Sequence, residues 1–383
     1  MRVDASGWTG RKGRTGGIGR KVKTTRAAIA LLFVTLALAA ARAAGPSHVD
    51  MTWMSIANVY FEFGSFRVLA DGYFTRLPQS AFFGSGGGLG QTRRPFVPDV
   101  RAVTRVFDVL GGRSSVNVLL TGHSHFDHSF DTPTWSTLTG ARIIGSKTTC
   151  FQAMAERVPP SRCVPVYGGE AIPLLSGVTM RVVRWNHSGD PAVNPEQHNP
   201  VELEAPPLRD QTTGGLRAGV AEDFPNGGGT RAFLFVVDGP DGRFSWLYQN
   251  SGSAVDLDVP IVVGSTNYGA PIENLKSALK AAGLDSVDLW IGTGGLPMAK
   301  LVLPVLKPKA YLPIHWDGLW GAFEAGVPQP YSDPSLQEFL TSSGVTLVKP
   351  LQYFDKWRLD RKGVRPLPND AIRKALGFST PRG

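Results

Sequence analysis

The chain has 383 residues, 42% hydrophobic and 19% charged, which excludes a largely disordered protein and allows one large or two modest domains. The formal net charge of +9 would favour a nucleic-acid or membrane-surface partner if it were spread evenly. However, residues 1–43 carry nine of the 40 basic residues and one of the 31 acidic ones, so residues 44–383 have a net charge of only +1. Nucleic acid is therefore excluded as an expected partner.

Residues 1–43 have the features of an export signal. A basic stretch precedes the apolar run 27–41, and Ala41-Arg42-Ala43 fits an A-x-A cleavage pattern before Ala44. The run is shorter than the ~20 residues that cross a bilayer core. We predict that residues 1–43 are a cleaved signal peptide and that the mature protein is periplasmic or secreted. The alternative is an uncleaved anchor, which would be the only expected membrane contact.

The body, residues 44–383, is predicted to be a single domain in which strands alternate with short helices. We expect strands over 52–63 and 66–70 (a hairpin ending at Asp71), 116–120, 141–145, 178–185, 231–238 and 243–248 (a second hairpin), 287–291, 310–314 and 345–348. We expect helices from about 132, and over 148–157, 274–282, 299–306 and 334–343. Residues 188–230 are rich in Pro, Gly and Asn, which indicates a lid, a binding loop or a disordered insertion.

The two cysteines of the chain are Cys150 and Cys163. In an oxidising compartment they can form one local disulfide, and the alternative is two buried thiols.

Three of the seven histidines fall within the six residues HSHFDH, as His123, His125 and His128 with Asp127 between them. In an extended segment the first two point to one side, and a turn after them brings Asp127 and His128 to a neighbouring point. One short segment can thus supply ligands to two metal ions a few ångströms apart. The alternative is a polar loop whose histidines and aspartate cap a helix.

This segment matches the HxHxDH motif of the metallo-β-lactamase superfamily, and the resemblance covers most of residues 52–350. His187, in RWNHSGD, and His315, in KPKAYLPIHWDG, resemble the later histidines of the family, and the opening hairpin ends at Asp71 in a similar turn. Within the superfamily the chain resembles the broad branch of lactonase-like and N-acyl-phosphatidylethanolamine phospholipase D-like proteins. The resemblance implies an α/β fold, a four-layer αβ/βα sandwich of two mixed β-sheets flanked by helices.

The resemblance also implies a set of metal ligands. His123, His125 and His187 would hold a first metal, and Asp127, His128 and His315 a second. Zinc suits these imidazoles and one carboxylate, as one or two ions, with iron or manganese as alternatives.

The chain departs from the family at one position. Asn250 stands in YQNSG where the family places an Asp that bridges the two metals. A neutral amide oxygen is a poorer ligand than a carboxylate, so Asn250 is a doubtful ligand and the second metal is expected to bind more weakly or not at all. Asp256 and Asp258 follow closely, but nothing in their spacing selects either as a substitute.

The function that follows is an exported metal-dependent hydrolase, in which metal-activated hydroxide attacks an ester, lactone, amide or phosphodiester. Asp127 would orient the attacking water and accept its proton. The expected substrate is a small or lipid-like molecule, and the sequence indicates no oligomeric state. Two alternatives are a non-catalytic metal-binding protein with a degenerate site and a mononuclear iron enzyme of the same fold. His198, in the long loop, is interpreted as a solvated loop residue or as a substrate contact.

Overall fold

The computed structural model describes residues 44–78, 95–190, 192, 201–217 and 228–378. By their contacts, the described residues from 44 to 378 belong to one compact unit. The predicted export signal and His198 lie outside the described residues. Among the described residues, no helix has the length and apolar character needed to span a membrane.

The first large sheet contains eight strands in the order β19-β18-β1-β2-β3-β5-β6-β7. Its antiparallel half is built from the ends of the chain, because β18 pairs with β1, and its other half, from β3 to β7, is parallel. The strands are β1 (His48–Trp53), β2 (Val59–Phe63), β3 (Phe66–Ala70), β5 (Val118–Leu120), β6 (Arg142–Gly145), β7 (Cys163–Pro165), β18 (Asp355–Asp360) and β19 (Gly363–Leu367).

The second large sheet contains seven strands in the order β17-β16-β15-β12-β11-β9-β8. β8, β9, β11 and β12 are antiparallel, whereas β12, β15, β16 and β17 are parallel. The strands are β8 (Ala171–Leu175), β9 (Val178–Trp185), β11 (Thr230–Gly239), β12 (Gly242–Tyr248), β15 (Val287–Gly292), β16 (Pro308–Pro313) and β17 (Thr346–Leu347). Two small pairs, β4 (Pro95–Phe96) with β10 (Leu216–Arg217) and β13 (Val262–Val263) with β14 (Thr266–Asn267), lie outside these sheets.

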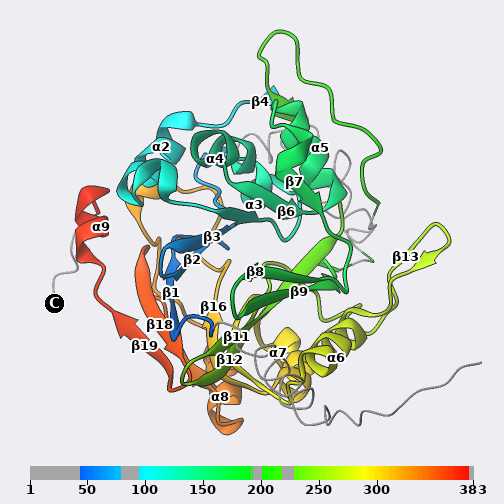
Figure 1. Ribbon diagram of the computed structural model, residues 1–383, viewed down its shortest axis with the longest axis vertical. Helices are drawn as coiled ribbons and strands as arrows, with labels where there is room; N and C mark the ends of the chain where they lie inside the picture. Colours follow the sequence, from blue (N-terminus) through cyan, green and yellow to red (C-terminus); the bar gives the residue numbers. More distant parts are fainter. Residues whose placement is uncertain (1–43, 79–94, 191, 193–200, 218–227, 379–383) are drawn as a thin grey trace, which may run out of the picture. The chain divides into compact units, whose positions relative to one another are not determined.

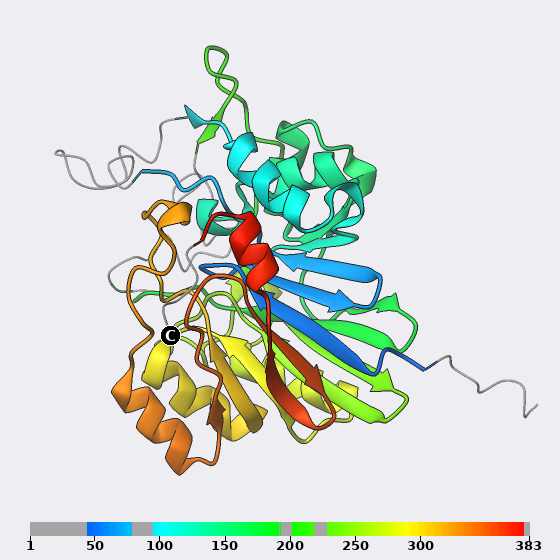
Figure 2. The ribbon, with the colours of Figure 1, turned by 90° about the vertical axis from the view of Figure 1, so that its left-hand side faces the viewer.

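Helices cover the outer face of each sheet, as Figures 1 and 2 show. On the first sheet lie α2 (Val100–Val109), α3 (Phe126–Ser129), α4 (Thr132–Thr139) and α5 (Lys147–Ala155). On the second lie α6 (Pro271–Ala282), α7 (Gly295–Leu306) and α8 (Pro334–Ser342), while α9 (Asp370–Ala375) follows β19. The short 3-10 turns are η3 (Gly112–Ser114), η4 (Pro160–Arg162) and η7 (Phe323–Ala325). The predicted sandwich of two mixed sheets flanked by helices is therefore confirmed.

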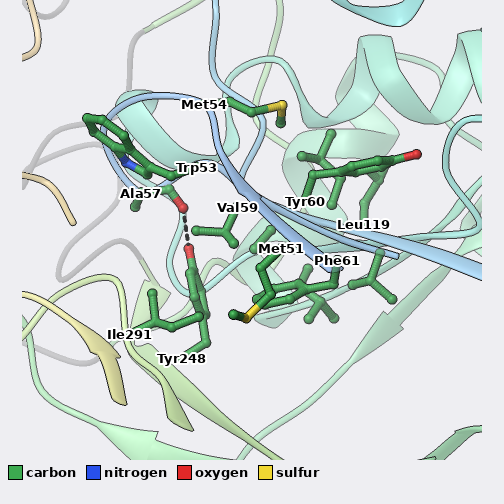
Figure 3. Close-up of a cluster of buried hydrophobic side chains, with 14 of the residues drawn as sticks. Met51, Trp53, Met54, Ala57, Val59, Tyr60, Phe61, Leu119, Tyr248 and Ile291 are labelled. Carbon is green, nitrogen blue, oxygen red and sulfur yellow. Dashed lines mark hydrogen bonds between the residues drawn. The ribbon is translucent and has the colours of Figure 1, made fainter. Parts of the chain in front are cut away.

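The main hydrophobic core fills the space between the two sheets. Phe61 of β2 contacts Phe235 and Trp246 of the second sheet, with ring centroids 5.4 and 5.6 Å apart. Figure 3 shows Phe61 with its neighbours Met51, Val59 and Leu119. Tyr248 enters the same core, and its hydroxyl donates to the carbonyl oxygen of Ala57 at 2.7 Å. A second core under α6, α7 and α8 includes Trp290 and Val302.

The strand expected over 52–63 is wrong, because β1 ends at Trp53 and β2 begins at Val59. Between them the backbone turns tightly, with φ of 113° at Ser55 and 46° at Ile56. The backbone nitrogen of Asn58 closes this turn by donating to the carbonyl oxygen of Ser55 at 2.8 Å, and the Asn58 side chain ties the turn to the carbonyl oxygen of Tyr73 at 2.8 Å. The carbonyl oxygen of Ile56 in turn accepts from the backbone nitrogen of His315 at 2.8 Å, so the turn positions a predicted ligand. His48 is the first residue of β1 and is half-buried.

Part of the long segment 188–230 is ordered against the body. Glu202 pairs with the fully buried guanidinium of Arg231, and the backbone nitrogen of Leu203 donates to Thr148 Oγ1 of α5 at 2.9 Å. β10 pairs with β4. This part of the segment is therefore docked on α5 and the second sheet.

Asp131 joins the start of α4 to the chain after β3. Its carboxylate accepts from the backbone nitrogens of Phe74 and Thr75, at 2.6 and 2.8 Å, and from the Thr75 hydroxyl. Burial raises the pKa of Asp131 to about 6, although these hydrogen bonds oppose the rise. In Asp131→Asn an amide NH2 would face one of these donors. We expect the free energy of unfolding to fall by about 1–3 kcal/mol, measured by urea denaturation. An unchanged urea midpoint would contradict this role.

Candidate metal centre

The HSHFDH segment joins strand β5 to helix α3. β5 ends at Leu120, and His125 caps α3 with φ of −68° and ψ of 158°. Asp127 and His128 consequently lie in the first turn of α3, and both are buried. The turn after the strand places them beside His123, whose ring centroid is 4.1 Å from that of His128.

Three further predicted residues lie at one edge of the second sheet. His187, Asn250 and His315 each lie two residues beyond a strand, namely β9, β12 and β16. β9 and β12 are both antiparallel to β11, and β12, β15 and β16 are mutually parallel. The carboxyl ends of these strands therefore meet at one edge, and this edge faces the HSHFDH segment.

The structure brings together the six predicted histidine and aspartate ligands as two groups. Within each group the potential ligand atoms all lie within 4.8 Å of one another. The first group is His123, His125 and His187, and the second is Asp127, His128 and His315.

In the first group the metal-facing nitrogens are fixed by hydrogen bonds on the opposite edges of the rings. His187 Nδ1 donates to the carbonyl oxygen of Ser188 at 2.8 Å, and His123 Nδ1 lies 3.3 Å from Asn250 Oδ1. Burial and the neighbouring imidazoles hold the pKa of His123 and of His187 well below the usual value. Both rings are therefore neutral, with their lone pairs on Nε2.

The two Nε2 atoms lie 3.2 Å apart. Two lone pairs at this separation repel each other unless a cation lies between them. In a tetrahedral zinc site with Zn–N distances of ~2.1 Å, two ligand nitrogens are ~3.4 Å apart. The neutral, buried donors of the first group thus fit a divalent metal.

The second group is held by contacts of the Asp127 carboxylate with two histidines. Asp127 Oδ2 lies 3.0 Å from His315 Nε2 and 3.2 Å from His128 Nε2. Burial lowers the pKa of His128, but Asp127 and Asp71 outweigh it and raise that pKa to about 10. Burial opposes ionisation of Asp127 as well, yet His128 and His315 hold the pKa of Asp127 well below its usual value. Because these donor atoms converge, they can also hold a cation, which would take the place of the shared protons.

Asp71 supports His128 directly and reaches His123 of the first group through Asn250. It lies at the end of β3 with φ of 60°, fully buried, and its carboxylate accepts from His128 Nδ1 at 2.7 Å and from Asn250 Nδ2 at 2.9 Å. The Tyr248 hydroxyl is 2.9 Å from the same carboxylate. Such outer partners fix the tautomer and the orientation of ligating imidazoles. The role of Tyr248 was missed from the sequence, although it stands in the same YQNSG segment as Asn250.

Asn250 is fully buried beside the site, and its amide lies against the Nδ1 edges of the His123 and His128 rings. Its Nδ2 donates to Asp71. In this arrangement it supports the imidazoles and leaves the Nε2 edges to the metal. Gly122 makes room for it, because a Cβ there would lie 2.3 Å from the amide. Of the two possible substitutes, Asp256 accepts from Asn186 Nδ2 at 2.6 Å, and Asp258 is exposed.

Two pairs of stacked aromatic rings include the sequence neighbours of His315 and Asp127. Trp316, next to His315, stacks on Trp53 with centroids 5.4 Å apart, and Trp320 stacks on Phe126 at 5.6 Å. His315 has 25% of its side chain exposed, whereas each histidine of the first group is at most 5% exposed. The second group is therefore the more accessible of the two.

No family model matches the chain, and no curated protein matches it. Solved structures with similar folds are found at low sequence identity. A metallo hydrolase, Igni18, from the archaeon Ignicoccus hospitalis is 9% identical with a TM-score of 0.47, over 81% of this chain and 98% of that one. YhfI from Bacillus subtilis, a metallo-β-lactamase fold protein, is 10% identical with a TM-score of 0.41, over 81% and 99%. The diiron β-hydroxylase CmlA from Streptomyces venezuelae is 13% identical with a TM-score of 0.44, over 84% and 55%.

The three structures are thus named as a metallo hydrolase, a protein of the metallo-β-lactamase fold and a diiron β-hydroxylase. The chain itself carries two groups of side chains that can hold metal ions.

Proposed function

We propose that the protein is a metal-dependent hydrolase that cleaves an ester, lactone, amide or phosphodiester of a small or lipid-like substrate. The observation that carries this proposal is the pair of neutral imidazoles, His123 and His187, whose Nε2 atoms face each other at 3.2 Å. A buried arrangement of this kind costs free energy unless a cation completes it. His125 completes the first ligand set, and Asp127, His128 and His315 form the second.

When bound, a divalent metal such as zinc would lower the pKa of a water molecule to about 7 and polarise the substrate oxygen. The residues of the chain would do the rest. Asp127 is a buried carboxylate between His128 and His315, where it would accept a hydrogen bond from the attacking water, orient that water and take up its proton. His315 is partly exposed, which allows a substrate to approach the second group.

The neutral Asn250 distinguishes the two groups. The first group has three imidazoles, which suit zinc. The second has two imidazoles and one carboxylate, and Asn250 stands where a second, bridging carboxylate would be expected. We therefore propose one tightly bound metal and a weaker second one. We also propose that residues 1–43 export the protein to the periplasm or beyond, which agrees with the disulfide between Cys150 and Cys163.

The test is metal analysis of the purified mature protein, followed by a panel of chromogenic esters, lactones, amides, β-lactams and phosphodiesters. We expect bound zinc, hydrolysis of at least one substrate class, loss of activity after a chelator and its return with zinc. A metal-free protein that gains no activity with zinc, manganese or iron would contradict the proposal. Iron in the purified protein with no hydrolysis would favour the mononuclear iron alternative.

A further inference from the structure

Helix α5 holds the HSHFDH segment through buried hydroxyl groups. Ser124, which separates His123 from His125, places its Oγ 2.6 Å from Thr149 Oγ1 and 3.1 Å from Ser146 Oγ. Ser146 caps the helix by accepting from the backbone nitrogen of Thr149 at 3.0 Å. All three hydroxyls are buried, so each depends on the others for its hydrogen bonds.

A second contact lies one turn further along the helix. Ser129 follows His128 directly, and its hydroxyl donates to Gln152 Oε1 at 2.6 Å. Both side chains are buried, with at most 2% exposure. The helix therefore contacts the ligand segment by hydrogen bonds at two points, Ser124 and Ser129. These residues lie on either side of His125, Asp127 and His128.

The disulfide fixes this same part of α5. Cys150 lies in the helix between Thr149 and Gln152, and it is bonded to Cys163, the first residue of β7. β7 is the edge strand of the first sheet and pairs with β6. The disulfide thus connects the part of α5 that contacts the ligand segment to the sheet whose strand β5 precedes that segment.

We propose that α5 is a positioning element for the metal ligands, with Thr149 and Gln152 as positioning residues, and that the Cys150–Cys163 disulfide holds it in place. This inference rests on the proposed metal site. Ligands held to within a fraction of an ångström bind a metal better than ligands that must first be ordered, because ordering opposes binding. Metal affinity is therefore expected to depend on the hydroxyl of Thr149 and on the disulfide.

The test measures the zinc dissociation constant of the metal-free full chain by competition with a chromogenic chelator. Thr149→Val keeps the shape of the side chain but removes its hydroxyl, and we expect about three- to tenfold weaker binding. Thr149→Ser restores a hydroxyl and is expected to bind zinc within about twofold of the wild type. The matched control is Ser136→Ala on the neighbouring helix α4. This substitution removes a buried hydroxyl that donates to the carbonyl oxygen of Ala141 at 2.9 Å. This control is expected to lower stability without weakening zinc binding.

The disulfide is tested in two ways. Cys150→Ala combined with Cys163→Ala is expected to weaken zinc binding to a similar extent. In the wild type, a dithiol reductant breaks the S–S bond and transfers two electrons and two protons to give two thiols, while the dithiol becomes a cyclic disulfide. After removal of the reductant without oxygen, zinc binding should be weaker, and reoxidation by glutathione disulfide should restore it.

If Thr149→Val and the reduced protein bind zinc as tightly as the untreated wild type, the inference is wrong. The proposed function would still stand in that case, because the wild type would bind zinc. If Thr149→Ser were as weak as Thr149→Val, or if Ser136→Ala weakened binding equally, the effect would be general destabilisation and the inference would be wrong. A wild type that binds no zinc would overturn both proposals.

Discussion

Replacing His123 with alanine is expected to remove the tightly bound metal and to lower hydrolysis of any substrate found in the panel by roughly a thousandfold or more. The reason is that His123 lies between the two groups, facing His187 at 3.2 Å and packing on His128 with ring centroids 4.1 Å apart. Without it, two imidazoles remain in the first group, too few for a closed zinc site. Metal content by mass spectrometry and the rate with a chromogenic substrate check this prediction.

The matched control is His48→Ala. The His48 side chain is half-buried, and within the described part of the chain its ring has one hydrogen-bond partner, Ser47. His48 begins β1 and is no part of either ligand group. We expect it to retain metal and activity. Full metal content and wild-type activity in His123→Ala would show that the metal lies elsewhere.

Asn250→Asp is expected to destabilise the metal-free protein by about 2–4 kcal/mol. In the wild type the Asn250 amide donates to Asp71 at 2.9 Å, so a carboxylate at position 250 would lose this bond and meet a second buried carboxylate at the same distance. Excess zinc should recover much of this loss, because the added negative charge strengthens binding of the second metal. Thermal unfolding with a chelator, and then with zinc, measures both effects.

Asn250→Ala provides the comparison for this substitution. It removes the donor to Asp71 without adding a charge, so we expect a smaller loss of stability and no gain in the second metal. Equal stabilities of Asn250→Asp and the wild type in chelator would contradict the supporting role of Asn250. A large rise in metal content with no activity in either protein would favour a non-catalytic metal-binding protein.

The ligand residues could be predicted from the sequence because each lies in a local pattern. His187 and His315 follow apolar strands, and the HSHFDH segment carries its own spacing. Most strands of the second sheet could be predicted for the same reason, and β9 begins and ends at the predicted residues 178 and 185. The break between Trp53 and Val59 could not, because it depends on Asn58 closing the turn and on the contact of Ile56 with the chain near His315.

The supporting network could not be predicted, since its members come from distant parts of the chain. Asp71, Tyr248 and Asn250 meet only when β3 and β12 pack from opposite sheets. The same holds for β18, whose pairing with β1 joins residues some 300 positions apart and leaves no local signal. The sequence left open whether Cys150 and Cys163 form a disulfide, and the structure joins them with their Cα atoms 5.5 Å apart.

We expect the two groups of side chains to hold metal unequally. The most direct test is a calorimetric titration of the metal-free protein with zinc. We expect one tight site per chain, assigned to His123, His125 and His187, followed by a weaker second site or none. Absence of saturable binding would contradict the account, and two equally tight sites would contradict the role given to Asn250.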